Sequence, residues 1–154
     1  MIVVDDTSAI TTLLQIGKAS LLQDLYHEVL IPEAVRVELL ILYSSLPDFI
    51  ETFPVKDRNA VARLLRVVDG GEAEAIVLAK KKHADLLLID ESEGRAVARR
   101  EGINFVGLLG VLVQAKFRGF IPSVHEVLGE IENSTTFFVS QEIKNVALRT
   151  AGEL

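Results

Sequence analysis

Residues 1–10 read MIVVDDTSAI. A short apolar run rich in β-branched residues, typical of a buried strand, stops at two aspartates, Asp5 and Asp6. Thr7 and Ser8 follow, and apolar residues then recur at the spacing of a helix. This opening predicts a buried strand that turns directly into a helix. Its carboxylates have two interpretations: they hold a divalent cation for phosphate chemistry, or they form an ordinary polar turn that caps the helix.

The composition of the chain is that of a globular protein. It has 154 residues, of which 49% are hydrophobic and 25% are charged, enough to bury the core of one domain. The absence of cysteine excludes a disulfide framework, a thiol nucleophile and a cysteine-based zinc site. No apolar run approaches the roughly 20 residues of a membrane helix, and no signal-type segment follows Met1. We expect a single domain over residues 1–154 in the cytoplasm, with no membrane partner.

The charge balance limits how the chain could bind nucleic acid. Its net charge is -6, so a general electrostatic hold on a polyanion is not expected. Binding would need a local cationic patch, and two candidates exist: the three lysines at 80–82, and Arg95 with Arg99 and Arg100. Each could equally be the solvated face of a helix.

Short strand-like runs alternate with helical patterns along the chain. Strands are expected at residues 2–4, 29–31, 86–89 and 104–106. Helices are expected from residue 7 or 8 to about 17, over 19–26, 33–42, 56–66, 69–82, 92–101 and 108–117, and after Pro122 and Ser140. Residues 44–55 contain two prolines and are expected to be a loop. This alternation predicts an α/β layered fold with a mainly parallel sheet, in which ligands gather at the carboxyl ends of the strands.

Four carboxylates are expected at that edge of the sheet. Asp6 follows the first strand, and Asp90 follows the strand at 86–89. A helix that leads into a parallel strand must start at the same edge. Glu72 lies in the first turn of the helix that leads into the strand at 86–89, so we expect it at this edge too. Glu38 lies about one and a half turns into the helix after the second strand, still near the edge.

The neighbours of the two glutamates predict that both point inward. Positions three and four away from Glu38 (34, 35, 41 and 42) are apolar, and Glu72 shares its face with Ala75, Ile76 and Ala79. An inward carboxylate is costly unless it is paired, protonated or bound to a cation. Mg²⁺ or Mn²⁺ prefers such oxygen ligands, polarises a phosphate and activates water for phosphodiester hydrolysis.

Simpler interpretations of the same residues remain open. The pairs Asp69/Glu72 and Asp90/Glu93 each have the spacing of a capping box. Asp6 could be a turn residue and Glu38 could be partly exposed. Thr7 and Ser8 are either helix caps or hydroxyls that orient Asp6 or a water. The remaining candidates are weaker: Glu74 is expected at the periphery, Glu91 has no assigned role, and the three histidines, at 27, 83 and 125, are too scattered for catalysis.

The whole chain resembles the PIN-domain superfamily, in particular its compact prokaryotic branch of VapC-like, predicted nucleic-acid-binding proteins. The matching stretches are VVDDTSAI, VLIPEAVRVELL, DGGEAEAIVLAKKKHADLLLIDESEGRAVA, INFVGLLGVLVQAKFRGFIPSV and FFVSQEIKNVALRTAGE, in the order that the family has them. The pairing of GEAEAI with DLLLIDE at this spacing is the most specific of these signals.

The resemblance implies a Rossmann-like α/β/α sandwich and a ribonuclease that depends on Mg²⁺ or Mn²⁺. The four acids of the family fall on Asp6, Glu38, Glu72 and Asp90, the same residues that the strand-end argument selects. Two departures are Asp5, where the branch has a small polar residue, and Ala9, where proline is common; neither removes a ligand. Arg95 could reach a substrate phosphate or form a structural salt bridge.

The resemblance also suggests partners. It implies an RNA substrate, a role as the toxin of a toxin–antitoxin pair with an antitoxin protein, and a homodimer. The high apolar content and the run at 106–117 point to a dimer as well. The alternative, from another functional class, is a PIN-like module that binds nucleic acid or protein without cutting.

Overall fold

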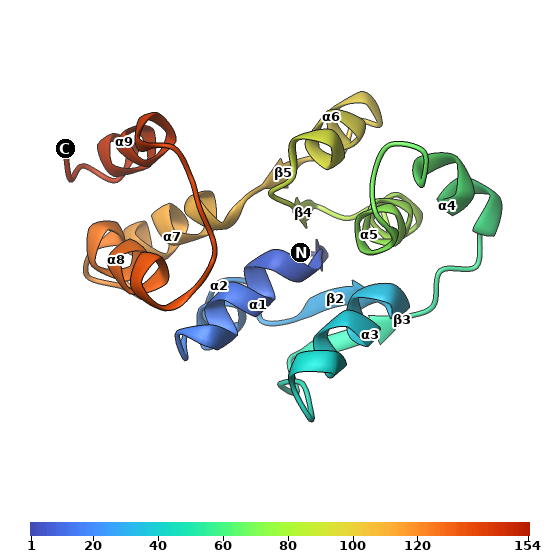
Figure 1. Cartoon of the computed structure of the whole chain (residues 1–154), viewed down its shortest axis with the longest axis horizontal. Helices are drawn as coiled ribbons and strands as arrows, with labels where there is room; N and C mark the ends of the chain where they lie inside the picture. Colours follow the sequence, from blue (N-terminus) through green and yellow to red (C-terminus); the bar gives the residue numbers. More distant parts are fainter.

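Five parallel strands form the centre of the molecule (Figure 1). The computed structural model describes residues 1–154. Its strands are β1 (Val3–Asp5), β2 (Val29–Pro32), β3 (Ile50–Phe53), β4 (Leu86–Leu88) and β5 (Phe105–Val106). They lie in the order β3-β2-β1-β4-β5, and every neighbouring pair is parallel. The predicted α/β fold with a parallel sheet is confirmed.

Nine helices surround the sheet. They are α1 (Thr7–Gln15), α2 (Ser20–Tyr26), α3 (Glu33–Leu42), α4 (Arg58–Leu64), α5 (Gly70–Lys81), α6 (Ser92–Arg100), α7 (Leu108–Phe117), α8 (Val124–Ser134) and α9 (Gln141–Thr150). The predicted bounds of α3 and α7 agree with the structure, and most of the others differ by one or two residues. Ser140 caps α9 as expected, and the helix expected after Pro122 is α8, which Ser123 caps.

Side chains of the strands alternate between two apolar layers. Val3 and Leu88 belong to a buried cluster that α1, α2, α7 and α8 complete, and Val4 and Leu87 belong to a second cluster with α4, α5 and α6. Successive residues of a strand point to opposite faces, so each strand contributes to both layers. Figure 1 shows α7, α8 and α9 on one side of the sheet and α4, α5 and α6 on the other. The result is a three-layer α/β/α sandwich.

The edge strand β3 was not predicted, because residues 44–55 were expected to be a loop. Ile50–Phe53 pairs with β2 over its whole length, from Val29↔Ile50 to Pro32↔Phe53. The segment has weak local signals: only Ile50 is buried, and prolines lie on both sides of it. Pairing with β2 decides its conformation, and β2 supplies that partner from a distant part of the sequence.

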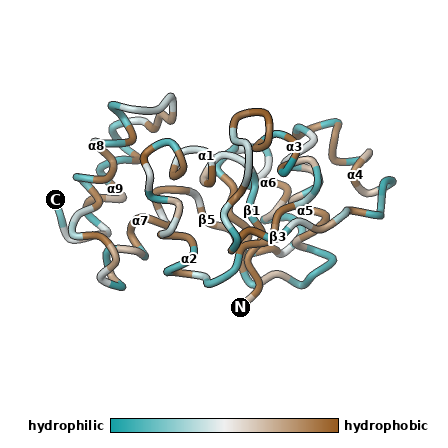
Figure 2. Tube along the Cα trace, turned by 90° about the horizontal axis from the view of Figure 1, so that it is seen from below, coloured by the Kyte–Doolittle hydropathy of each residue, from teal (hydrophilic) through white to brown (hydrophobic).

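The hydropathy of the chain follows this layering. The segments around β1 and β3 are coloured as hydrophobic in Figure 2. No helix has both the length and the apolar content needed to cross a membrane. The run at 106–117 lies mostly in the chain's own core, because α7 buries five of its residues and leaves Phe117 as its largely exposed end. This run therefore offers little of the free apolar surface that the predicted dimer would use.

Candidate active site

Asp6 and Asp90 end two neighbouring strands at the same edge of the sheet. β1 and β4 pair in parallel, with Asp5 opposite Leu88. The backbone N–H of Asp6 donates to the carbonyl of Leu88 at 3.1 Å, which continues the ladder one residue beyond β1. Both aspartates therefore lie at the edge of the sheet where the sequence predicted them.

Glu38 reaches the Asp6 carboxylate from α3, which is the helix that follows β2. The hydroxyl of Thr7 donates a hydrogen bond to Oε2 of Glu38. A Cβ built on Gly71 would lie 2.8 Å from Oε1 of Glu38 and 3.3 Å from Oδ1 of Asp6. Both carboxylates thus converge on the space beside Gly71, and a side chain at position 71 would push the carboxylate of Glu38 aside.

Glu72 approaches the same edge from the first turn of α5. Its side chain is buried, with the residue only 5% exposed. A Cβ built on Gly94 would lie 2.7 Å from Oε2 of Glu72, so Gly94 leaves room for this carboxylate as well. The backbone N–H of Glu72 donates to Oδ1 of Asp69 at 2.8 Å, which confirms Asp69 as the cap of α5.

Asp90 is held by donors from two helices. The N–H of Leu108, at the start of α7, donates to Oδ1 at 3.1 Å, and Ser8 Oγ donates to Oδ2 at 3.4 Å. The guanidinium of Arg95 lies 3.6 Å from Oδ1. Glu91, not Asp90, occupies the cap position of α6, so the capping-box interpretation of Asp90 and Glu93 is wrong.

Burial and mutual repulsion raise the pKa values of these acids. Burial raises the pKa of Asp6 to about 7, with Asp69, Glu38 and Asp90 adding to the shift and the backbone N–H of Thr7 opposing it. Burial raises the pKa of Glu72 to about 8, and Asp69 and Asp6 add to it. The edge is therefore an environment that disfavours its own negative charge at neutral pH.

Hydrogen-bond donors and a cation oppose the effect of burial on the pKa of Asp90. Burial raises its pKa, while the N–H of Leu108, Arg95 and Ser8 lower it. Its donors partly offset the desolvation of the carboxylate, so Asp90 is the best-satisfied acid of the four.

Arg95 has partners within the fold. Its Nε donates to the carbonyl of Ile89 at 3.0 Å, and its guanidinium lies 5.6 Å from the centre of the Phe105 ring. Two roles were considered for Arg95, contact with a substrate phosphate and a structural salt bridge. These contacts and the ion pair to Asp90 fit the structural salt bridge.

Two details of the sequence argument were wrong. Ile41 and Leu42, which suggested an inward face for Glu38, are 78% and 62% exposed. Glu38 is only half-buried, and its hydrogen bond from Thr7 places it at the edge. Glu74 is not peripheral: it is buried and accepts from the N–H of Ala34 at 3.0 Å and from Arg58 at 2.9 Å.

Sequence reasoning gave no role in the site to Asp5, Asp69 and Glu91. Asp5 is buried, and neither of its carboxylate oxygens has a hydrogen-bond partner. Burial raises its pKa well above its usual value, with contributions from Asp6 and Asp90. Asp69 and Glu91 both raise the pKa of Glu72. Two features of the sequence could have pointed to these residues. Asp69 occupies the cap position just before Glu72, and Asp5 is an acid at the end of an apolar strand.

The acids gather at one edge without forming a ready-made metal cage. No group of three or more acidic or histidine side chains is arranged to hold a metal ion. The oxygen-only donor set nevertheless suits Mg²⁺ or Mn²⁺. The absence of side chains at Gly71 and Gly94 leaves space beside the carboxylates for such an ion. Its positive charge would also lower the raised pKa values of Asp6 and Glu72.

The fold and this acidic edge define a nuclease-like α/β/α protein of the PIN class. The family model for the PIN domain DUF3368 matches residues 2–153. The chain therefore belongs to this PIN-domain family, and the predicted superfamily is confirmed. PIN domains generally use divalent metal ions. No match to the chain was found among curated proteins.

Proposed function

We propose that this chain is a Mg²⁺- or Mn²⁺-dependent endoribonuclease that hydrolyses RNA phosphodiester bonds. The observation that carries the proposal is the meeting of Asp6, Glu38, Glu72 and Asp90 at one edge of the sheet. These side chains come from the ends of β1 and β4 and from α3 and α5. Repelling carboxylates of this kind are typical of functional sites, because a fold gains no stability from them.

In this proposal the four acids hold the ion, and their neighbours keep them in place. A bound divalent ion would supply charge stabilisation at the phosphate and lower the pKa of a water molecule. Thr7 orients Glu38 through its hydroxyl, and Ser8 and the N–H of Leu108 orient Asp90. Arg95 balances part of the charge of Asp90 and restricts its movement. Glycines at 71 and 94 leave the space in which these oxygens can face a phosphate.

The biological setting belongs to the same proposal. We propose a cytoplasmic toxin that an antitoxin protein inhibits, as the resemblance to VapC-like proteins implies. A homodimer is part of the proposal as well. Its support is an exposed apolar face on α3, where Val37, Ile41 and Leu42 are 53%, 78% and 62% exposed.

A second function, nucleic-acid or protein binding without cleavage, is favoured by one observation. The acids are not arranged as a metal cage, and a PIN-like module that had lost metal-dependent turnover could keep the rest of the fold.

Cleavage of a labelled single-stranded RNA pool with Mn²⁺ or Mg²⁺ separates the two functions. Wild type is compared with Asp6→Asn and Asp90→Asn, each with and without a chelator, and with Asp24→Asn as a matched control at an exposed residue of α2. Cleavage by wild type and the control alone, abolished by the chelator, supports the nuclease. Cleavage that survives in both active-site variants would contradict the proposed residues. RNA binding without any cleavage would favour the binding module.

A further inference from the structure

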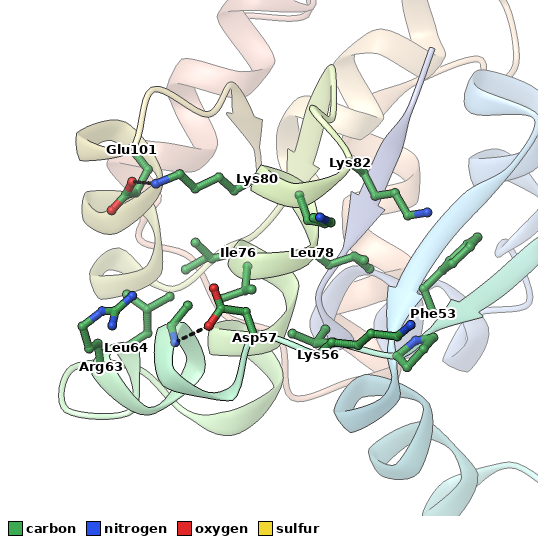
Figure 3. A pocket seen from close by; sticks show the side chains of 15 residues that line it. Phe53, Lys56, Asp57, Arg63, Leu64, Ile76, Leu78, Lys80, Lys82 and Glu101 are labelled. Carbon is green, nitrogen blue, oxygen red and sulfur yellow. Dashed lines mark hydrogen bonds and ion pairs between the residues drawn. The ribbon is translucent and has the colours of Figure 1, made fainter.

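A cationic pocket lies between α4, α5 and the end of β3, away from the acidic edge (Figure 3). It has a volume of about 850 Å³, within the usual range for ligand pockets. Five of the chain's 16 lysines and arginines line it, against two acids. The cations are Lys56, Arg63, Lys80, Lys81 and Lys82, and the acids are Asp57 and Glu101. In a chain with a net charge of -6, this pocket is a local concentration of positive charge.

Most of this positive charge is not neutralised within the chain. Lys80 pairs with Glu101 at 2.7 Å. The carboxylate of Asp57 is used as the cap of α4, where it accepts from the N–H of Ala60 at 3.0 Å. The other three exposed cations, Lys56, Arg63 and Lys81, form no salt bridge. Their charge is available to a ligand.

The lining of the pocket is partly apolar and includes an aromatic ring, that of Phe53. Seven of the 15 lining residues are hydrophobic. The ammonium group of Lys82 lies 4.1 Å from the centre of the Phe53 ring, and the ends of Lys56 and Lys82 both lie toward Phe53 in Figure 3. Phosphates beside cations and a base against an aromatic ring are the two contacts by which proteins hold single-stranded nucleic acid.

We propose that this pocket holds single-stranded RNA whose strand continues to the acidic edge. The inference rests on the proposed function, because it names where the substrate of that site is retained. The acidic edge repels a polyanion, so an RNA strand needs cations elsewhere on the chain. α5 joins the two places: Glu72 is in its first turn at the edge, and Lys80 follows eight residues later, about 12 Å along the helix.

An acidic protein segment is the competing occupant. It would satisfy the lysines but has no flat base to stack on Phe53. The test therefore separates the electrostatic contribution from the stacking contribution, and it compares RNA with an acidic peptide.

The experiment measures binding of a fluorescein-labelled single-stranded RNA by anisotropy over a range of salt concentrations, with a chelator present throughout. The pocket variant is Lys56→Glu/Lys81→Glu. The matched control is Arg118→Glu/Arg149→Glu, which makes the same charge change at exposed residues far from the pocket, at the ends of α7 and α9. Lys56→Gln/Lys81→Gln removes the two charges without adding acids, and Phe53→Leu removes the ring but keeps an apolar side chain on β3. Circular dichroism checks that each variant is folded.

The pocket variant is expected to bind RNA at least about 10-fold more weakly, with the control within about twofold. For the pocket variant, the slope of log K against log salt should become shallower by about 1.4. This is the change expected when two phosphate contacts on a single strand are lost. The glutamine variant should show the same fall in slope with a smaller loss of affinity. Phe53→Leu should weaken binding without changing the slope, because stacking releases no counterions.

Three results would overturn the proposal. One is an equal loss in the pocket variant and the control, which would mean that only overall charge matters. Another is unchanged binding in the pocket variants. The third is a polyglutamate peptide of matched length that competes with RNA for the pocket at equal concentration, which would assign it to an acidic protein. Since no metal or turnover enters the assay, absence of cleavage would contradict the nuclease alone and leave this result intact.

Discussion

The carboxylates of the acidic edge and the carboxylate of Glu153 have opposite surroundings. At the acidic edge, Asp6 and Glu72 are buried near other acids, and their pKa values are raised to about 7 and about 8. At the other end of the molecule, Glu153 is surrounded by donors. It accepts from the N–H groups of Val124 and His125 at 2.7 and 2.9 Å and from Ser123 Oγ at 2.9 Å, and it pairs with Lys116 at 2.9 Å.

The difference shows what a structural carboxylate looks like in this fold. Burial alone would raise the pKa of Glu153, but its four donors outweigh burial and lower it to about 2. Glu153 ties the C-terminus to the start of α8, where a negative charge also meets the positive end of the helix. The acids of the edge have few such donors, so they weaken the fold that holds them. An arrangement of this kind is expected where a ligand, and not the fold, provides the missing positive charge.

The largest expected effect is on catalysis. Asp90→Asn keeps the size of the side chain and removes a proposed ion ligand, so cleavage of RNA should fall by more than about 100-fold, since even residues that only support metal ligands contribute about 10–100-fold. Glu153→Gln should keep wild-type cleavage at a temperature where it is folded. Initial rates with saturating Mn²⁺ measure both. Equal losses in the two variants would remove the functional distinction between the two groups of acids.

The next effect is stabilisation by a divalent ion. Mn²⁺ at about 100 times its Kd should add about 2.7 kcal/mol to the free energy of unfolding and raise Tm by roughly 5–10 °C. Glu72→Gln should reduce this rise, because one repelling carboxylate and one ligand are gone. Thermal unfolding followed by circular dichroism, with Ca²⁺-free and chelated buffers as references, gives the measurement. A Tm that does not respond to the ion in wild type would contradict the metal site.

Removal of the satisfied carboxylate should destabilise the protein. Glu153→Gln loses the charge that Lys116 and the start of α8 share, and we expect the free energy of unfolding to fall by about 1–2 kcal/mol at pH 7. The matched variant Asp6→Asn, in metal-free buffer, should leave stability unchanged or increase it. Urea denaturation of both variants decides this. A destabilised Asp6→Asn would show that Asp6 has a structural role after all.

The last prediction concerns the sign of the pH dependence of the free energy of unfolding, whose slope is at most about 1.4 kcal/mol per pH unit for each proton. The folded pKa of Glu153 lies below its ordinary value of 4.5, so its stabilisation is present above about pH 4.5 and is lost as the pH falls toward 2. The folded pKa values of Asp6 and Glu72 lie above their ordinary values of 3.8 and 4.5. Their stabilisation is therefore present at about pH 4 and is lost as the pH rises toward 8.

Urea denaturation of the metal-free protein from pH 3 to pH 9 tests both signs. Stability should pass through a maximum on the acid side of neutrality. In Glu153→Gln the fall at low pH should become shallower, and in Asp6→Asn the fall at high pH should become shallower. A wild-type curve that keeps rising up to pH 8 would contradict the raised pKa values of the edge.

Local sequence signals were enough for most of the fold. The apolar runs predicted four of the five strands, and helical periodicity predicted α3 and α7 with their bounds. A parallel sheet then requires Asp6 and Asp90 to share an edge, and the direction of α5 adds Glu72. Glu38 follows from its place on α3, the helix that begins directly after β2. Four candidate residues could therefore be chosen without coordinates. Whether they bind an ion stays a prediction.

Features that depend on residues distant in the sequence became visible only in the folded protein. β3 forms because β2 lies beside it, Thr7 bonds to Glu38 across 31 positions, and Asp90 accepts from Leu108 across 18. The same holds for the hydrogen bonds that Glu153 accepts from the start of α8 and for the cationic pocket between α4 and α5. The periodicity, the strand ends and the types of side chain at the edge follow from the sequence alone, because they depend on residues a few positions apart. The sequence could not determine which donors each carboxylate meets, since those contacts arise only when separate elements pack together.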